Sequence, residues 1–201
     1  MTSPRIGVLA LQGAFDAHVA AFGRLGVVAD LVRTPDQLAS IDALVLPGGE
    51  STTMSMLLES SGLFDAIADR LQMGMPALGT CAGLILLARD VLDGRPDQRF
   101  FGAIDVVARR NGYGRQIDSF EETTPVVGLD VPEFPVVFIR APIVESVGPQ
   151  VVTLATIGGR PALCREGNIL VAAFHPELTG DVRIHQMFLQ LVANSLATVR
   201  E

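Results

Sequence analysis

The sequence of 201 residues contains no lysine, so all 15 of its basic residues are arginine. Without a side-chain amine, the chain cannot form a Schiff base with a carbonyl substrate. It also lacks the lysine on which the Walker A phosphate loop depends. These absences exclude imine chemistry and P-loop nucleotide hydrolysis on this chain.

Positive charge is scarce in the chain as a whole. The 15 basic residues are outnumbered by 22 acidic ones, which leaves a formal net charge of −7 at pH 7. A field of this sign repels nucleic-acid phosphates and anionic lipid headgroups. We therefore expect neither nucleic acid nor a membrane among the partners.

Cysteine and long apolar runs are also rare. Cys81 and Cys164 are the only cysteines, too few for a disulfide framework in a chain that is 49% hydrophobic. No apolar run approaches the roughly 18 residues that span a bilayer, and the run from Ile6 to Leu11 is too short for a signal sequence. These features predict a soluble, cytoplasmic protein.

The first half of the chain alternates short apolar runs with segments of helical periodicity. We expect a single domain over residues 1–201, because a chain of this length buries one sizeable core. The alternation predicts an α/β fold with an open, mostly parallel, doubly wound sheet of the flavodoxin-like type and helices on both faces. Strands are expected over Arg5–Leu11, Val27–Leu31, Asp42–Leu46 and Met75–Gly79, and helices over Ala14–Leu25, Thr52–Leu71 with a break near Gly62, and Ala82–Val91.

Residues Phe101–Phe174 have a different sequence pattern, in which Val, Ile and Phe are separated by turn residues. This pattern predicts an antiparallel β extension. A core strand over Ile169–Phe174 and an amphipathic helix over Asp181–Val199 should complete the fold. Turns are expected at Asn111-Gly112, Glu133-Phe134-Pro135, Gly158-Gly159 and Glu166-Gly167-Asn168.

Cys81 lies in Gly79-Thr80-Cys81-Ala82-Gly83, between a predicted strand and a predicted helix. This is the frame of a nucleophile elbow, in which small residues allow a sharp turn that presents the nucleophile over the first helical turn. A helix N-terminus favours the thiolate, which is the reactive form. Taken alone, the pattern fits an inert cysteine packed beside glycines equally well. Cys164 lacks this frame, and we expect it in the core of a strand.

His175 follows a predicted strand in Phe174-His175-Pro176-Glu177, at the carboxyl end where open α/β sheets place their sites. Pro176 favours an extended backbone at His175, and in an extended chain residues two apart point to the same side. Glu177 can therefore orient the imidazole while His175 serves Cys81 as a base. His18 and His185 fall within helical segments, where we expect solvated or capping histidines.

The segment Pro47-Gly48-Gly49-Glu50-Ser51 also lies between a strand and a helix. Its glycines let backbone N–H groups approach a ligand, and the tetrahedral intermediate of acyl transfer needs such donors. By itself Pro-Gly-Gly is an ordinary turn, and Ser51 lacks the frame of a nucleophile. In combination with Cys81 and His175, it favours an acyl-transfer site.

In this order, the three segments resemble the class I (triad) glutamine amidotransferases. More specifically, they resemble the glutaminase subunits of pyridoxal 5′-phosphate synthase, and the resemblance runs from Leu9 to the last helix. The segments that carry it are Leu9-Ala10-Leu11-Gln12-Gly13, Gly48-Gly49-Glu50-Ser51-Thr52-Thr53, Arg110-Asn111-Gly112-Tyr113-Gly114-Arg115-Gln116, Phe138-Ile139-Arg140-Ala141-Pro142 and Phe174-His175-Pro176-Glu177-Leu178-Thr179.

The resemblance implies that Cys81 attacks the side-chain amide of L-glutamine, so that a thioester forms and ammonia leaves. His175 would act as general base and then acid, Glu177 would orient it, and the N–H groups of Gly49 and Ala82 would form the oxyanion hole. Arginine suits the α-carboxylate of glutamine because it forms bidentate hydrogen bonds. The implied glutamine-binding residues are Gly48, Gly49, Glu50, Ser51, Arg110, Ile139 and Arg140.

The resemblance implies no metal and no cofactor, but it does imply a partner. This is the synthase subunit that makes pyridoxal 5′-phosphate (vitamin B6) and supplies the lysine chemistry that this chain lacks. The partner should dock over the loops that surround the elbow, and docking should order the oxyanion loop. The candidate docking loops are Gln12-Gly13, Pro47–Ser51 and Arg109–Gln116.

Two alternatives remain open at this stage. The same chemistry could serve another acceptor, as in the glutaminase of imidazole glycerol phosphate synthase, although the segment Arg110–Gln116 disfavours it. From a different class, a stress sensor or chaperone on a flavodoxin-like sheet would oxidise its elbow cysteine rather than acylate it. Such a protein has no need of the His175–Glu177 pair or of the Pro47–Ser51 loop.

Overall fold

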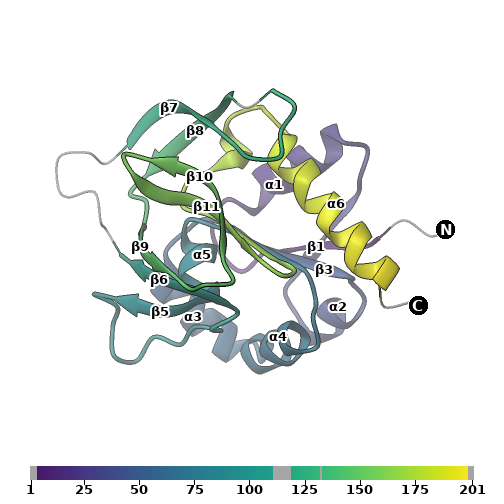
Figure 1. The fold of residues 1–201 in the computed structure, drawn as a ribbon. Coiled ribbons are helices and arrows are strands. Elements are labelled where there is room, and N and C mark those ends of the chain that lie inside the picture. The colour runs from purple at the N-terminus through teal and green to yellow at the C-terminus, as the bar shows by residue number, and fades with distance from the viewer. Residues whose placement is uncertain (1–3, 111–118, 132, 199–201) are drawn as a thin grey trace.

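The computed structural model describes residues 4–110, 119–131 and 133–198. Its central sheet has seven strands: β1 (Ile6–Leu9), β2 (Ala29–Val32), β3 (Ala43–Leu46), β4 (Ala77–Thr80), β10 (Val152–Ile157), β11 (Arg160–Glu166) and β12 (Ile169–Ala172). Their order is β10-β11-β12-β4-β3-β1-β2 (Figure 1). The segment β2-β1-β3-β4-β12 is parallel, and β11 and β10 continue it in antiparallel fashion. This strand order is that of flavodoxin-like folds, as predicted.

Helices cover both faces of this sheet. They are α1 (Phe15–Arg24), α2 (Pro35–Ala39), α3 (Ser51–Ser60), α4 (Leu63–Gln72), α5 (Ala82–Leu87) and α6 (Arg183–Thr198), with a short 3-10 helix, η1, over Pro176–Leu178. Figure 1 shows α1 and α6 above the sheet and α2, α3 and α4 below it. The predicted break at Gly62 is confirmed: its φ of 72° separates α3 from α4.

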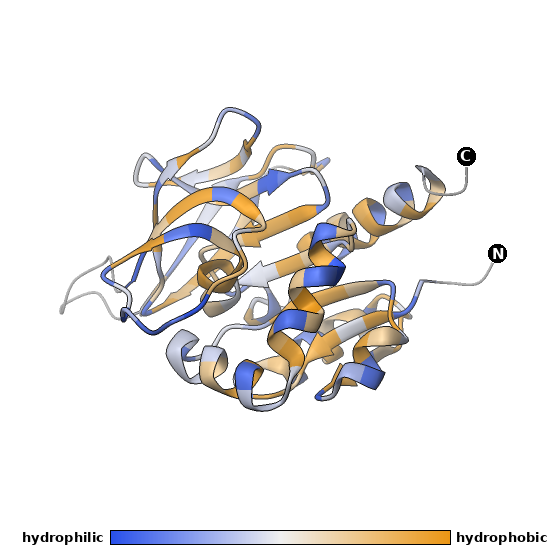
Figure 2. Cartoon of the chain, turned by 90° about the horizontal axis from the view of Figure 1, so that it is seen from below, coloured by the Kyte–Doolittle hydropathy of each residue, from blue (hydrophilic) through white to orange (hydrophobic). Residues whose placement is uncertain are grey.

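The parallel strands are buried on both faces, which explains their continuous apolar character. Strands β1, β3, β4 and β12 are buried at every position. Figure 2 shows these strands in the orange of hydrophobic residues, whereas the helices alternate orange with blue faces. Among the described residues, no helix has the length and apolar character needed to cross a membrane.

The β extension packs against one end of the sheet. One part has three strands, β5 (Ala88–Leu92), β6 (Ile104–Arg109) and β9 (Ile143–Val147), and the other is a two-stranded ribbon of β7 (Ser119–Pro125) and β8 (Glu133–Ile139). The predicted turns at Gly158-Gly159 and at Glu166-Gly167-Asn168 lie between β10, β11 and β12. The predicted turn at Asn111-Gly112 lies outside the described residues.

The structure corrects two predictions about these elements and adds one helix. The helix expected over Ala82–Val91 ends at Leu87, because the following residues pair in parallel with β6, and this pairing overrides helix propensity. The turn expected at Glu133-Phe134-Pro135 is the start of β8, where a two-stranded ribbon tolerates proline. The helix α2 is an addition to the predicted elements, and Thr34 and Gln37 form a capping box at its start.

Candidate functional site

Cys81 occupies a sharp turn between β4 and α5. Its backbone has φ 50° and ψ −102°, a strained conformation for a residue with a side chain. The Cys81 N–H donates to the carbonyl oxygen of Ala172 at 2.9 Å, which ties the turn to β12. A Cβ on Gly83 would collide with the backbone of Leu46, so the following turn of helix requires glycine. The structure therefore has the geometry of a nucleophile elbow.

His175 and Glu177 lie where β12 ends, next to this elbow. The His175 Nδ1 is 2.7 Å from Glu177 Oε1, and the N–H of His175 donates to Val137 O in β8 at 2.8 Å. Burial lowers the pKa of His175, but hydrogen bonding and charge interactions with Cys81 and Glu177 prevail and raise the pKa to about 10. The protonated imidazole is thus favoured at its place between Cys81 and the Glu177 carboxylate.

Glu177 is itself buried, with 4% of its surface exposed. Burial alone raises the pKa of its carboxyl group, but neighbouring histidines outweigh this effect and hold the pKa below its ordinary value. The carboxylate is therefore ionised when it contacts His175.

Gly48 lies directly against the cysteine and the histidine. A Cβ at this position would overlap the imidazole of His175 and would lie 3.3 Å from Cys81 Cβ, so no larger residue fits. The loop is fixed by Ala14 N–H, which donates to Gly48 O at 2.9 Å. Gln12 Oε1 also accepts from Glu50 N–H at 3.0 Å.

These segments surround one cavity of about 340 Å³. Except for Glu177, which lies behind His175, every residue predicted for the site lines it. The cavity lining also includes residues that the sequence did not assign to the substrate site: Gln12, Gly13, Ala14, Ile85 and Leu178. Ile85 could have been predicted, because it lies four residues after Cys81 and so shares its face of the helix.

The acidic and basic groups nearest the Pro-Gly-Gly loop bind each other. Arg110 Nη2 is 2.9 Å from Glu50 Oε1, and Arg110 Nη1 donates to Gln98 Oε1 at 3.1 Å. Glu50 also caps α3, accepting from Thr52 N at 3.1 Å and from Thr53 N at 2.6 Å. Burial raises the pKa of Glu50, but these hydrogen bonds outweigh it and lower the pKa below its usual value. Glu50 is therefore both a helix cap and a wall of the cavity.

Arg140 and Ser51 line the cavity, and neither side chain has a hydrogen-bond or ion-pair partner among the described residues. Within the described ranges, Arg140 forms no ion pair, and its φ of 44° holds it in the left-handed region at the end of β8. Ser51 Oγ is buried and, in the same part of the chain, accepts and donates no hydrogen bond. An unpaired cation and an unpaired hydroxyl in one cavity suit a zwitterionic amino acid ligand.

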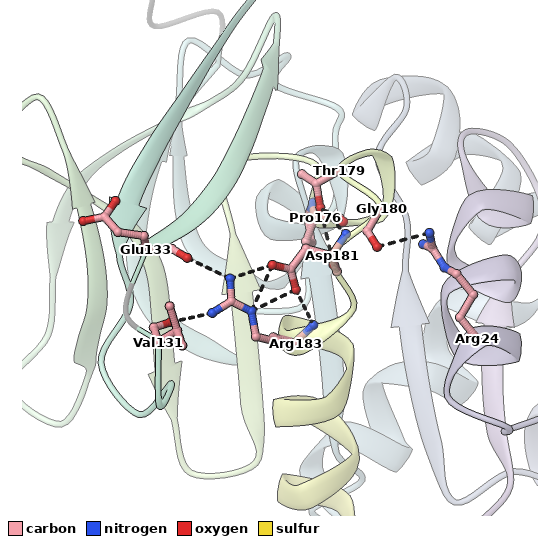
Figure 3. Close-up of polar contacts among 8 residues, drawn as sticks. All are labelled: Arg24, Val131, Glu133, Pro176, Thr179, Gly180, Asp181 and Arg183. Carbon is pink, nitrogen blue, oxygen red and sulfur yellow. Dashed lines mark hydrogen bonds and ion pairs between the residues drawn. The ribbon is translucent and has the colours of Figure 1, made fainter.

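The loop that follows His175 is anchored on both sides (Figure 3). Thr179 Oγ1 accepts from Asp181 N–H at 3.1 Å, and Arg183 Nη2 lies 2.6 Å from Asp181 Oδ2. On the other side, Arg24 of α1 donates to the carbonyl oxygen of Gly180 at 3.3 Å. Arg183 also donates to backbone carbonyl groups at Val131 and Glu133. These contacts join α6 to the β7–β8 ribbon and fix the loop that carries Glu177.

The prediction for His18 and His185 is wrong. Both rings are fully buried rather than solvated or capping, because His18 and Phe22 of α1 contact His185 of α6. His18 Nδ1 is 2.9 Å from His185 Nε2, and His18 Nε2 is 3.1 Å from Thr80 Oγ1 and 3.5 Å from Glu177 Oε2. No local pattern indicates this chain of contacts, since the two histidines are 167 residues apart.

Cys164 is buried in β11, as predicted. Burial raises the pKa of its thiol to about 11, which disfavours the reactive thiolate. Among the described residues, no group of three or more His, Cys, Asp or Glu is placed to hold a metal ion.

Comparisons with known proteins agree with this geometry. Residues 8–194 match the SNO glutamine amidotransferase family. The chain is 50% identical to pyridoxal 5′-phosphate synthase subunit PdxT of Parafrankia sp., over 100% of this chain and 98% of that protein. It is 52% identical to the subunit of the same name from Mycobacteroides abscessus, over 94% of this chain and 98% of the relative.

Solved structures show the same fold. A glutamine amidotransferase crystal structure superposes with a TM-score of 0.88 at 44% identity, covering 94% of this chain and 98% of that one. Another glutamine amidotransferase, from Thermotoga maritima, has a TM-score of 0.60 at 15% identity, covering 98% of this chain and 97% of that one, and shares the fold alone. The chain belongs to the SNO glutamine amidotransferase family.

Proposed function

We propose that the chain is the glutaminase subunit of a pyridoxal 5′-phosphate synthase. It hydrolyses L-glutamine to glutamate and delivers the ammonia to a separate synthase subunit. The relatives that are about half identical over nearly their full length carry this name. The observation that carries the hydrolysis is the meeting of the Cys81 elbow, the His175–Glu177 pair and the Gly48-Gly49 loop around one cavity.

Acylation requires Cys81 to react as the thiolate, and His175, whose pKa is raised, holds the proton as imidazolium. The Cys81 thiolate attacks the side-chain amide carbon of glutamine, and the carbonyl oxygen becomes an oxyanion. The N–H groups of Gly49 and Ala82 stabilise that oxyanion; as the first residue of α5, Ala82 has an N–H without an intrahelical acceptor. His175 donates its proton to the amide nitrogen, the C–N bond breaks, and ammonia leaves.

Deacylation uses His175 in the opposite direction. The neutral imidazole takes a proton from water while the oxygen of that water attacks the thioester carbon. The C–S bond then breaks, glutamate leaves, and Cys81 returns as the thiolate beside imidazolium. Glu177 holds the ring through Nδ1 in both half-reactions, which keeps Nε2 available for proton transfer.

Recognition of glutamine is assigned to the rest of the cavity. Arg140 is available for the α-carboxylate, since it has no carboxylate partner in the described part of the chain. Ser51 offers its free hydroxyl group, and the backbone at Ile139 closes the cavity near Cys81, with Ile139 O 4.0 Å from Sγ. Arg110 and Glu50 form the wall next to the oxyanion loop.

A partner chain follows from the absence of lysine. Imine chemistry on sugar phosphates has to occur on another chain, and ammonia released into neutral water becomes the non-nucleophilic ammonium ion. The synthase subunit should therefore dock over the Gln12-Gly13 and Pro47–Ser51 loops and receive ammonia internally. Arg109 and Arg110 are described, but the rest of the predicted docking loop Arg109–Gln116 lies outside the described residues.

No observation favours either alternative function, a glutaminase that serves another acceptor or a cysteine-based stress sensor or chaperone. Both curated relatives are named as subunits of a pyridoxal 5′-phosphate synthase, and neither is named as a subunit of an imidazole glycerol phosphate synthase. Membership of an amidotransferase family favours acylation of Cys81 over a role as an oxidised sensor. A cytoplasmic location remains a prediction, which the two free cysteines suit.

The test is to measure glutamate and ammonia from glutamine with the isolated chain and with its cognate synthase subunit. We expect low activity for the chain alone and a clear rise in the complex, with Cys81→Ala as the inactive control. An enzyme that traps free ammonia should leave the rate of pyridoxal 5′-phosphate formation unchanged if transfer is internal. Equal turnover with and without the synthase subunit would contradict gating by the partner.

A further inference from the structure

A row of buried polar side chains lies behind the His175–Glu177 pair. It starts at Glu177 Oε2, passes through His18 of α1 and ends at His185 of α6, with Thr80 beside it (Figure 1 shows both helices). His18, Thr80 and His185 have 0% exposure. Burying three polar side chains together is costly unless each group is hydrogen-bonded in a specific way. The proposed mechanism uses none of these three.

The contacts select one arrangement of protons. His185 Nδ1 is buried and, within the described ranges, has no hydrogen-bond partner. A buried N–H without an acceptor is costly, so the proton of His185 belongs on Nε2, from where it is donated to His18 Nδ1. His18 then carries its own proton on Nε2, the nitrogen that faces Thr80 and Glu177.

The opposite pair of tautomers, with the protons on His18 Nδ1 and His185 Nδ1, is unfavourable at both histidines. It would leave an unpaired N–H on His185 and would place the Nε2 lone pair of His18 3.5 Å from a carboxylate oxygen. That oxygen, Glu177 Oε2, is buried and, in the described part of the chain, receives no aligned hydrogen bond. A carboxylate in this position needs a donor, and His18 Nε2–H is the one within reach.

Resting on the proposed function, we propose that His18 is a positioning residue for the glutaminase reaction. Its Nε2–H is shared between Thr80 Oγ1 at 3.1 Å and the outer oxygen of Glu177 at 3.5 Å, so its positive end faces that oxygen while the inner oxygen contacts His175. His185 fixes the tautomer that supplies this N–H. The carboxylate is thus held from both sides, much as hydrogen-bond partners behind a metal site orient the ligands in front of them. The orientation of the Glu177 carboxylate toward His175 thus depends on α1, a helix that does not contact the substrate.

The charges around this row of side chains agree with a neutral donor. His18 is faced by Glu177, by His175 beyond it, and by His185, whereas Arg24 lies near His185. Burial keeps the pKa of His18 below its ordinary value despite the nearby carboxylate. Burial and the neighbouring His18 lower the pKa of His185 to about 3. At neutral pH both rings therefore act through N–H groups.

The experiment compares His18→Leu, which removes the donor, with His18→Gln, which keeps an amide N–H. In the complex with the synthase subunit, His18→Leu should lower kcat about 10- to 100-fold with KM changed less than about twofold. His18→Gln should recover about half or more of the loss on a logarithmic scale. Val192→Ala, which truncates a buried residue of α6, the helix that carries His185, is the packing control and should stay within about threefold.

A second readout does not depend on glutamine hydrolysis. Alkylation of Cys81 by iodoacetamide, followed across pH, reports the thiolate that the His175–Glu177 pair stabilises. The midpoint should move up by about one pH unit in His18→Leu and stay in place in His18→Gln and Val192→Ala. If the wild-type complex fails to hydrolyse glutamine, the proposed function fails, but this alkylation curve still tests His18.

A folded His18→Leu protein with unchanged kcat and an unchanged alkylation midpoint would overturn the proposal. Equal losses in His18→Leu and Val192→Ala would do the same, since they would indicate packing alone. If His18→Leu does not fold, His185→Phe decides, because it removes the N–H that fixes the tautomer and leaves His18 in place. The proposal then expects a midpoint shift of the same sign and about half the size; no shift would overturn it.

Discussion

The two halves of the cavity are built from different kinds of sheet. The carboxyl ends of the parallel strands supply Cys81, His175 and Glu177, which are 6%, 6% and 4% exposed. The β extension, which is antiparallel except for the parallel β5–β6 pair and is called the antiparallel half below, supplies Arg110, Ile139 and Arg140. Of these, Ile139 is 38% exposed. Buried turns between strand and helix hold reacting groups rigidly, whereas strand ends at the surface present groups that a substrate reaches first. We therefore expect the parallel half to control kcat and the antiparallel half to control KM.

The largest effect that can test this comparison is the loss of the nucleophile. Cys81→Ala should lower glutamine hydrolysis by about 10⁴-fold or more, because the thioester cannot form. Cys164→Ser should stay within about threefold, because that thiol is buried in β11 and does not line the cavity. Steady-state ammonia release by the complex measures both. Labelling of Cys164 rather than Cys81 by a glutamine-analogue alkylator would show that the wrong cysteine was assigned.

The next effect separates the base from the group that orients it. His175→Asn should reduce kcat nearly as much as Cys81→Ala, while Glu177→Gln should leave about 10- to 100-fold more activity, since an orienting carboxylate usually contributes less. KM should change little in either variant. Rates of the two variants at saturating glutamine decide the matter. A fully active His175→Asn protein would remove the acyl-transfer mechanism.

A smaller effect is expected in the antiparallel half. Arg140→Met should raise KM for glutamine about 10- to 100-fold with little change in kcat, as for the loss of a charged hydrogen bond to the α-carboxylate. A glutamine analogue without the α-carboxylate should be almost insensitive to this substitution. Arg160→Met is the matched control, because Arg160 lies outside the cavity and pairs with Glu145 at 3.7 Å. A fall in kcat at constant KM would contradict the division between the halves.

The parallel half could be predicted from the sequence for physical reasons. Its strands are buried on both faces and are therefore continuous apolar runs, and its turns require small residues next to Cys81 and at Gly48. The contact of His175 with Glu177 agrees with the prediction, but its premise of an extended segment is wrong, because Pro176–Leu178 form a 3-10 helix. Local geometry thus determines most of the reacting groups.

The other features depend on contacts that are distant in sequence. The start of β8 contains a proline and therefore has the local pattern of a turn, and the residues after Leu87 join β6 only because that strand lies alongside. The glutamine-binding roles of Arg110, Ile139 and Arg140 rest on resemblance, since nothing in their local sequence indicates a pocket. The surroundings of His18 and His185 escape prediction for the same reason: helical periodicity shows which face is buried, but not which polar groups meet there.

The smallest effect concerns how His175 and the buried His185 contribute to the free energy of unfolding at different pH values. Unfolding measurements in acid test the contribution of His185. A histidine whose pKa is raised, as His175 to about 10, stabilises the fold below about pH 6.5 and loses this contribution as the pH rises through 10. His185, whose pKa is lowered to about 3, does the reverse: folding keeps it neutral, so its contribution is present above pH 6.5 and is lost as the pH falls.

A histidine buried in its neutral form should cost about 1.4 kcal/mol of unfolding free energy per pH unit below 6.5, or about 2 kcal/mol at pH 5. Urea unfolding at pH 7 and pH 5 should therefore show a smaller pH dependence for His185→Phe than for the unsubstituted chain, by about that amount, whatever the variant's stability at pH 7. An equal pH dependence in both proteins would mean that His185 is protonated within the fold and that the buried side chains behind Glu177 carry a charge.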